Sequence, residues 1–215
     1  MSRKSSISAS IAATDTPAGQ RGPLEHERRD QIIREADEHF RRNGYSQTSV
    51  AELAKAIGVS SAYVYRFFDS KQAIGEAVCR AVLARMAAAL WEIAQRPNSA
   101  SQRIRLLVKA LKNQGQEQYF KQRALHDIVS TALRDHWPSV LVHRYEILQV
   151  VRKVVGDGRQ SGEFERKTPL DETCLAIFEC LMPFAHPLLL ELRTPEELDV
   201  SVVAVTNLVL RSLAP

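Results

Sequence analysis

The sequence predicts an all-α protein with a small N-terminal domain of three helices and a larger C-terminal helical domain. Apolar residues recur at helical spacing from about residue 31 onward, and no run of alternating β-branched residues suggests a sheet. The 215 residues, 45% of them hydrophobic and 25% charged, suit one or two domains with an ample core. We expect the domains at 24–87 and 88–215, after a mobile tail at 1–23 that is rich in Ser, Ala, Thr and Pro.

Residues 31–71 contain the first three helices, separated by tight turns. In the first helix, apolar side chains recur at helical spacing up to Phe40. Gly44 then ends the helix, because glycine accepts the left-handed conformation that closes a helix C-terminus. The second helix follows at once, since Ser49 and Glu52 have the spacing of a capping box.

The turn between the second and third helices contains Gly58, and Ser60 can cap a third helix over residues 61–67. Two helices joined by a short glycine-containing turn are typical of a helix-turn-helix, which places its second helix in the DNA major groove. Many other helical hairpins also turn at glycine, so spacing alone is only moderately specific. We place the helix-turn-helix at about residues 48–67.

The residue types in this region add a family resemblance. The matching positions, in order, are Gly44-Tyr45, Thr48-Ser49-Val50, Leu53-Ala54, Gly58-Val59-Ser60, Val64-Tyr65, Phe68 and Ser70-Lys71. In this order they resemble the N-terminal domain of the tetracycline-repressor (TetR) family of bacterial transcription regulators, over roughly residues 28–86. Tyr63 and Val64 replace the Thr and Leu that are common in the family, which leaves the base preference open.

The resemblance implies phosphate contacts from Thr48, Tyr65 and Lys71. A hydroxyl beside a helix N-terminus, a phenol and an ammonium each suit a phosphate oxygen. Between Leu24 and Lys71 there are eight Lys or Arg and eight Asp or Glu residues, so this region is neutral. Any positive face must therefore come from the arrangement of these charges.

Base contacts are expected from the outward residues of the third helix, which are Ser61, Ala62, Tyr63 and Arg66. Arg66 suits guanine O6 and N7, with a phosphate contact or a solvated charge as the alternative. The Tyr63 ring suits a thymine methyl group, with a partly buried ring beside Phe67 as the alternative.

The remaining sequence predicts helices throughout. We expect them over residues 71–94, 100–114, 117–135, 137–160, 170–192 and 196–213. Gly115 and the prolines mark several of the breaks. The last two helices are apolar over more of their surface than one core-facing stripe requires, which predicts a homodimer through a four-helix interface. The resemblance implies the same interface; the alternative is that both helices are central in the core of one subunit.

The resemblance also implies a small-molecule pocket in the second domain, whose ligand lowers the affinity for the operator. Candidate lining residues, aromatic, soft or imidazole-bearing, are Tyr119, Phe120, His126, Trp137, His143, Tyr145, Phe178, Met182 and His186. Each of them alone also suits an ordinary core position. They favour an apolar or amphipathic effector.

The three histidines among these residues, His126, His143 and His186, fall on three different predicted helices. If their imidazoles converge, they suit a divalent metal or an acidic ligand. Hydrogen bonds between helices or exposed rings are the alternatives, because no short ligand spacing is present.

Other protein classes have weak support. No apolar run is long enough to span a bilayer, and no secretory signal is evident. The odd number of cysteines, without a C-x-x-C pair, predicts a reduced, cytoplasmic setting. Residues 156–162 have G-x-G-x-x-x-G spacing, but they follow a helix, so a turn that ends the helix explains them better than a phosphate-binding loop. We therefore expect neither an enzyme nor a cofactor.

Together these observations predict a ligand-responsive regulator, most consistent with a repressor, that binds a palindromic operator in double-stranded DNA as a homodimer. Two alternatives stay open. One is a metal-sensing regulator of the same fold, and the other is a helical enzyme or adaptor without DNA binding.

Overall fold

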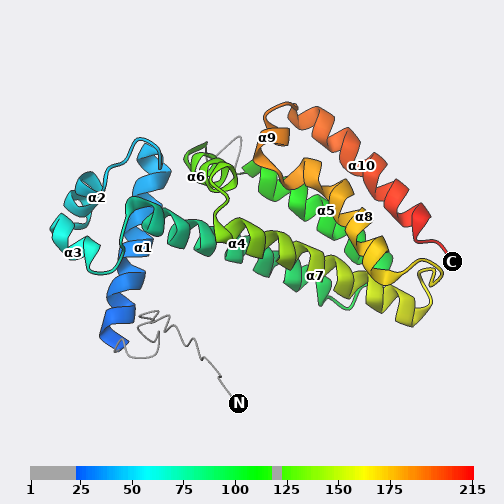
Figure 1. Cartoon of the computed structure of the whole chain (residues 1–215). Helices are drawn as coiled ribbons and strands as arrows, with labels where there is room; N and C mark the ends of the chain where they lie inside the picture. The colour runs from blue at the N-terminus through cyan, green and yellow to red at the C-terminus, as the bar shows by residue number, and fades with distance from the viewer. Residues whose placement is uncertain (1–22, 118–122) are drawn as a thin grey trace, which may run out of the picture.

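The computed structural model describes residues 23–117 and 123–215, and within these ranges every regular element is a helix (Figure 1). The helices are α1 (Pro23–Asn43), α2 (Val50–Ile57), α3 (Ser61–Tyr65), α4 (Lys71–Ala94), α5 (Ala100–Gln116), α6 (Arg123–Arg134), α7 (Pro138–Ser161), α8 (Leu170–Ala185), α9 (Pro187–Leu190) and α10 (Pro195–Ser212). The all-α prediction is confirmed. In this part of the chain no helix is both long enough and apolar enough to cross a membrane.

The predicted helix over residues 170–192 is wrong, because the structure has two helices there. α8 ends at Ala185, and α9 begins at Pro187. His186 between them has extended backbone angles, φ −86° and ψ 118°. The proline ring disfavours a helical conformation at the residue before it, so Pro187 accounts for the break.

Gly115 does not end a helix, contrary to expectation, since α5 continues to Gln116. A Cβ atom at Gly115 would lie 2.4 Å from the carbonyl oxygen of Phe184 and 2.9 Å from Cδ1 of Leu190. Glycine is therefore needed at this position so that α5 can approach α8 and α9 closely.

Other boundaries shift by a few residues. α1 begins at Pro23 rather than near residue 31, and α3 ends at Tyr65 rather than at residue 67. α6 covers residues 123–134 of the helix expected over 117–135. The predicted tail before α1 lies outside the described residues.

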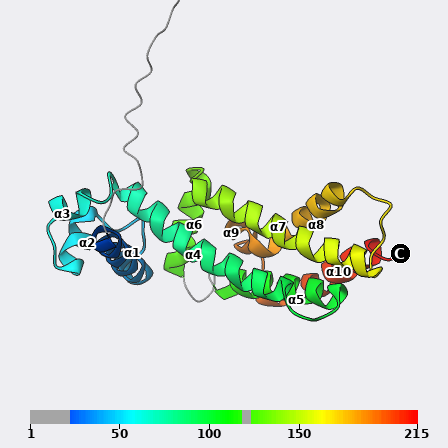
Figure 2. The ribbon, with the colours of Figure 1, turned by 90° about the horizontal axis from the view of Figure 1, so that it is seen from below.

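The buried apolar residues form two clusters that share α4. The N-terminal cluster joins α1, α2, α3 and the first half of α4 to residues of α6 and to the start of α7. The C-terminal cluster joins the end of α4 to α5, α7, α8, α9 and α10. Figures 1 and 2 show α4 running from the three N-terminal helices into the C-terminal bundle, with α7 packed along it.

The N-terminal cluster contains a stack of aromatic rings, which we call the junction: Phe40, Tyr45 and Trp137 over Gly75. The Tyr45 ring packs edge-on against Phe40 (centroids 5.3 Å apart) and against Trp137 (5.5 Å). Trp137 precedes α7 and is 1% exposed. A Cβ atom at Gly75 of α4 would lie 2.6 Å from the Tyr45 ring and 2.7 Å from the Trp137 ring. A side chain on α4 at this point would push the two rings away.

We predict that Gly75→Ala lowers the free energy of unfolding by about 1–3 kcal/mol, because overpacking displaces the junction rings. Gly156→Ala is the matched control, since Gly156 lies inside a helix and its Cβ atom would meet nothing within 4 Å. The control should stabilise the protein by up to about 1 kcal/mol, the helix-propensity difference. Urea unfolding measures both, and equal effects of the two substitutions would contradict the prediction.

Candidate DNA-binding surface and effector pocket

The helix-turn-helix is fixed by hydrogen bonds between its own residues. The Ser49 hydroxyl accepts from the Glu52 backbone N–H (3.2 Å), and the Glu52 carboxylate accepts from the Ser49 backbone N–H (2.7 Å). The bond from the Ser49 backbone N–H, and then one from the Ser49 hydroxyl to the same carboxylate (2.8 Å), lower the pKa of Glu52. Gly58 ends α2 in the left-handed conformation (φ 77°), and the Ser60 hydroxyl caps α3 by accepting from the Tyr63 N–H at 3.1 Å. The capping predicted from sequence therefore forms.

α3 turns one face to the core and the opposite face to solvent. Val64 and, just after the helix, Phe68 are buried in the N-terminal cluster. The predicted base-reading residues Ala62 and Arg66 are exposed, while Ser61 and Tyr63 are half-buried. The Tyr63 ring lies 5.3 Å from that of Phe67, and the Arg66 guanidinium lies 6.0 Å from the centre of the Tyr63 ring.

The predicted phosphate-contacting residues surround one shallow hollow on this surface. It lies between the first turn of α2, α3 and the start of α4, and Thr48, Ser61, Tyr65 and Lys71 all line it. Tyr65 is half exposed. The first amides of α2 also face this region and have no acceptor within their own helix.

The Thr48 side chain is 3% exposed, and its hydroxyl donates to the carbonyl oxygen of Gly44 at 2.7 Å. A phosphate contact from this residue stays a prediction. Lys71 also has an internal contact, because its ammonium donates to the Ser46 carbonyl (3.3 Å) and lies 4.5 Å from the centre of the Tyr45 ring. Unlike the Thr48 hydroxyl, an ammonium has further N–H donors for a phosphate.

Some of the charged residues of the N-terminal helices are paired and others are not. On α1, Arg41 pairs with Asp37 and Arg42 with Glu38. Lys55 of α2, Arg66 just after α3 and Lys71 at the start of α4 form no ion pair within the described part of the chain. Although the region is neutral overall, these cations are not held in ion pairs.

Two carboxylates bind the N-terminal helices to the C-terminal bundle. Asp127 of α6 accepts from both the backbone N–H and the hydroxyl of Ser46, each at 2.8 Å. Glu76 of α4 accepts from the backbone N–H of Ser139 at 2.9 Å and from its hydroxyl at 3.0 Å, at the start of α7. The sequence carries no signal for either contact, because the partners are 81 and 63 residues apart.

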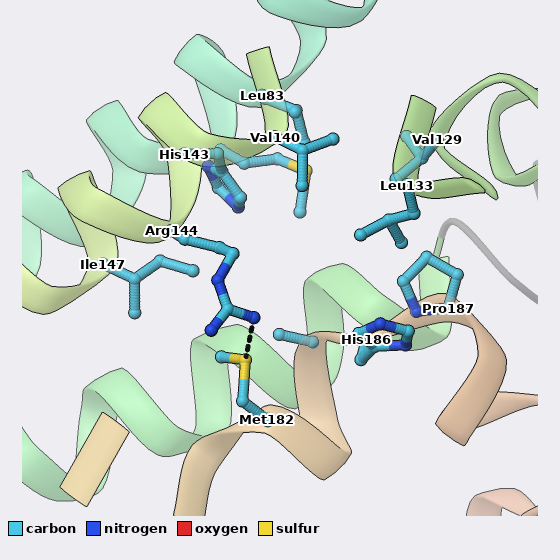
Figure 3. A pocket seen from close by; sticks show the side chains of 12 residues that line it. Leu83, Val129, Leu133, Val140, His143, Arg144, Ile147, Met182, His186 and Pro187 are labelled. Carbon is cyan, nitrogen blue, oxygen red and sulfur yellow. Dashed lines mark hydrogen bonds between the residues drawn. The ribbon is translucent and has the colours of Figure 1, made fainter. Parts of the chain in front are cut away.

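Next to the junction lies a cavity of about 50 Å³, lined by residues of α4, α6, α7, α8 and α9 and of the break between α8 and α9 (Figure 3). Its lining is mainly apolar, with the exception of two histidines and one arginine. The residues are Leu83, Met86, Val129, Leu133, Val140, His143, Arg144, Ile147, Met182, Ala185, His186 and Pro187. Such a lining, apolar with a few polar groups, is typical of small-molecule sites.

His143 and His186 are the polar groups that the sequence analysis expected here. Burial lowers the pKa of His143 to about 4, although the Leu83 backbone and the Glu146 carboxylate oppose this shift. Burial, and then the charge of Arg144, lower the pKa of His186. Both rings are therefore neutral at pH 7.

Other predicted effector residues lie elsewhere. Trp137 belongs to the junction, Tyr145 is 60% exposed on the outer side of α7, and Phe178 is in the C-terminal core beneath the Arg144 guanidinium. None of these three lines the cavity. Tyr119 and Phe120 fall outside the described residues, as does the side chain of His126.

Sequence reasoning missed Arg144. Val140, Arg144 and Ile147 follow one another at spacings of four and three residues on α7, and all three line the cavity. An arginine inside an apolar stripe of a helix was the available signal.

No group of three or more potential metal ligands occurs among the described side chains. The proposed metal site includes His126, whose side chain is not described. The metal-sensing alternative therefore stays a prediction.

We predict that His143 makes stability depend on pH. Its pKa in the folded state, about 4, is below its ordinary value of 6.5, so the unfolded chain takes up this proton first. The folded state then loses on the order of 3 kcal/mol as the pH falls from about 6.5 to about 4. Urea unfolding at several pH values should show that His143→Gln removes much of this loss.

His26→Gln, at an exposed position of α1, is the matched control and should keep the wild-type pH dependence. Comparison with wild type is needed because several carboxylates with lowered pKa values also lose stability in acid. An unchanged pH dependence in His143→Gln would refute the prediction.

Comparison with known families identifies both parts of the chain. Residues 32–78 match the family described as bacterial regulatory proteins, tetR family, and residues 100–206 match the tetracyclin repressor-like C-terminal domain. A search of curated proteins finds no match.

Solved structures of similar fold include regulators from three bacteria. The Bacillus subtilis regulator FadR, in complex with stearoyl-CoA, is 19% identical (86% of this chain, 98% of that chain, TM-score 0.63). PfmR, a TetR family regulator from Thermus thermophilus, is 22% identical (86% and 99%, TM-score 0.57). A TetR-family regulator from Pectobacterium atrosepticum is 18% identical (90% and 98%, TM-score 0.69).

These structures share the fold of the chain, and the two family matches together cover more than half of its length. With its capped helix-turn-helix and its helical C-terminal bundle, the chain belongs to the TetR family of DNA-binding transcription regulators.

Proposed function

We propose that this protein is a repressor that binds a palindromic operator as a homodimer and leaves it when a small effector occupies the cavity between α6 and α8. The observation that carries the proposal is the exposed face of α3, held by Val64 and Phe68 in the core and flanked by the hollow around Tyr65 and Lys71. We propose residues 24–87 as the DNA-binding domain and residues 88–215 as the effector-binding and dimerisation domain, in a cytoplasmic protein.

On DNA, α3 enters the major groove. Tyr65 and Lys71 bind phosphates at its edge and set the position of the helix, while Ser61, Ala62, Tyr63 and Arg66 face the base pairs. Thr48 assists through its place at the hollow and through the backbone, because its hydroxyl is already bonded to Gly44.

The dimer forms through α8 and α10. Leu198, Val209 and Leu213 are buried within the subunit, whereas Leu175 of α8 and Val200, Val203 and Leu208 of α10 are more than half exposed. On α10 these exposed residues recur at three to five positions and form one stripe. A second copy of the chain would cover this stripe in a two-fold dimer. The dimer would then place its two α3 helices so that they can bind two DNA half-sites about 34–36 Å apart.

α6 connects the cavity to the DNA-binding helices. Val129 and Leu133 of α6 line the cavity, and Asp127 of the same helix holds Ser46, just before α2. An effector that displaces α6 moves this carboxylate and so changes the setting of the helix-turn-helix. The effector releases DNA only if it binds the displaced arrangement more tightly, because only differential affinity shifts populations.

The effector is apolar or amphipathic, as the lining of the cavity supports. A structural relative was crystallised with stearoyl-CoA, which supports a ligand-responsive role for this fold. Selecting bound fragments from the source genome tests the proposal, with inverted half-sites centred one DNA turn or a multiple of it apart as the expected result. Absence of salt-dependent duplex binding would refute it.

We predict that Tyr65→Phe and Lys71→Ala each weaken binding to the selected operator and to unrelated duplex alike, by about three- to thirtyfold, because they remove phosphate contacts. Arg66→Ala should instead change the preferred sequence, at a cost of about 1–3 kcal/mol for the original operator. Fluorescence anisotropy with both duplexes at fixed salt measures the effects.

Arg96→Ala is the control for a lost positive charge, since Arg96 is exposed just beyond the far end of α4. It should leave both affinities unchanged. If Arg66→Ala lowers the affinity for all duplexes equally, Arg66 does not contact bases.

We also predict that Val203→Arg yields a monomer, because the substitution places a charge in the proposed α8–α10 interface. Light scattering should show half the wild-type mass, and affinity for a two-half-site operator should fall at least about tenfold with the loss of the second contact. Leu141→Arg, at an exposed apolar position of α7, is the matched control and should stay dimeric. If Val203→Arg is dimeric, as the Leu141→Arg control should be, the α8–α10 interface is excluded.

A further inference from the structure

We propose that the cavity beneath α6 binds the carboxylate of a small organic acid, with Arg144 as its main partner and His186 as a further donor. This inference rests on the proposed role of the cavity as the effector site. It goes further by naming the chemical class of the effector.

Arg144 has no strong partner of its own. Its guanidinium extends from α7 toward the cavity, where Nη1 donates to the sulfur of Met182 at 3.7 Å (Figure 3). A thioether sulfur is a weak acceptor. The Glu179 carboxylate lies 3.8 Å from Nη2, and both side chains are about half exposed, so this pair is weak. Within the described chain Arg144 makes no hydrogen bond to an oxygen atom, although a guanidinium fork fits a carboxylate with two parallel bonds.

The two imidazoles each bring a buried nitrogen without a partner, and one of them adds a donor. Nδ1 of His143 and Nδ1 of His186 are both buried and have no hydrogen-bond partner in the part of the chain that the structure describes. A buried polar atom without a partner costs about 1–3 kcal/mol, so an acceptor brought by a ligand is favourable here. A neutral imidazole donates through only one of its nitrogens, and burial keeps both rings neutral. His143 already donates to the Leu83 backbone, so its Nδ1 is an acceptor, whereas Nδ1 of His186 can carry a proton. Arg144 and His186 therefore offer donors from α7 and from the α8–α9 break, which suits the several lone pairs of a carboxylate.

The other walls require an apolar tail. Val129, Leu133 and Pro187 lie across the space from Arg144 and His143 in Figure 3, and Leu83 and Val140 close its upper side. A bare anion would leave these walls uncovered, and a cation would be repelled by Arg144. The volume of about 50 Å³ corresponds to roughly three to five waters, which selects a short acid unless α6 or Arg144 moves.

Calorimetry on the full-length protein without DNA tests the inference with butyrate and its neutral isostere butyramide. Butyrate should bind at least about tenfold more tightly than butyramide, the ratio expected for one charge-assisted hydrogen-bond pair. Arg144→Gln should weaken butyrate binding by at least about tenfold, and Arg144→Lys, which keeps the charge but loses the fork, by less. Arg152→Gln is the matched control on the same helix, because Arg152 pairs with Asp171, outside the cavity lining, and it should bind butyrate as wild type does.

Several results would overturn the inference. The first is equal affinity for butyrate and butyramide, and the second is wild-type butyrate affinity in folded Arg144→Gln. The third is binding of inorganic phosphate as tight as that of butyrate. The fourth is no binding of butyrate, hexanoate or benzoate at about 10 mM, a concentration that would fill a site with a millimolar Kd. Operator binding is measured separately on the same protein. Failure of acid binding with intact operator binding refutes the acid site alone, whereas loss of operator binding refutes the regulator proposal and leaves the calorimetric result standing.

Discussion

The packing of Tyr45 and Trp137 against the bare backbone at Gly75 is the constraint on which the rest of the structure depends. This packing brings together the loop before α2, which carries Tyr45, the second turn of α4 at Gly75, and the start of α7 at Trp137. The loop then lies where Asp127 can bind Ser46, and the start of α7 lies where Ser139 can bind Glu76. The orientation of α3 relative to the bundle follows from these contacts.

The cavity beside the junction combines two opposed features. Most of its walls are apolar, yet Arg144, His143 and His186 carry hydrogen-bonding groups into it. The buried Nδ1 atoms of His143 and His186 have no partner within the described residues, which costs free energy, and native proteins retain such a cost mainly where a ligand or a function compensates for it. α6 lines this cavity and also carries Asp127, which accepts a hydrogen bond from Ser46. A change at the cavity that moves α6 would therefore also move the segment before α2.

Much of the fold could be predicted from the sequence because its signals are local. Helical spacing, the Ser49 and Glu52 capping box, and the turn at Gly58 each involve residues close together in the chain, and each forms as expected. The error at His186 was also local, since Pro187 signalled the break.

The site was harder to predict because its geometry is not local. Which face of an aromatic or histidine-bearing helix turns to a cavity depends on its neighbours, so His143, Met182 and His186 line the space while Trp137 and Tyr145 do not. The predicted helix end at Gly115 was wrong for the same reason. This glycine allows α8 and α9 to approach α5 closely, and α5 continues past it. The hydroxyl of Thr48 was assigned to phosphate, although a carbonyl one turn away already takes it.

The sharing of one core between distant segments has a consequence for dissecting the protein. Ile128, Val129 and Ala132 of α6, together with Trp137 and Val140, complete the hydrophobic cluster that begins with α1. A truncation after residue 87 would strip that cluster of its covering side and leave the Tyr45 ring facing water. The core of the three N-terminal helices is thus completed by residues that follow α5 in the chain, and we expect a fragment ending at residue 87 to be less stable than the same residues in the whole protein.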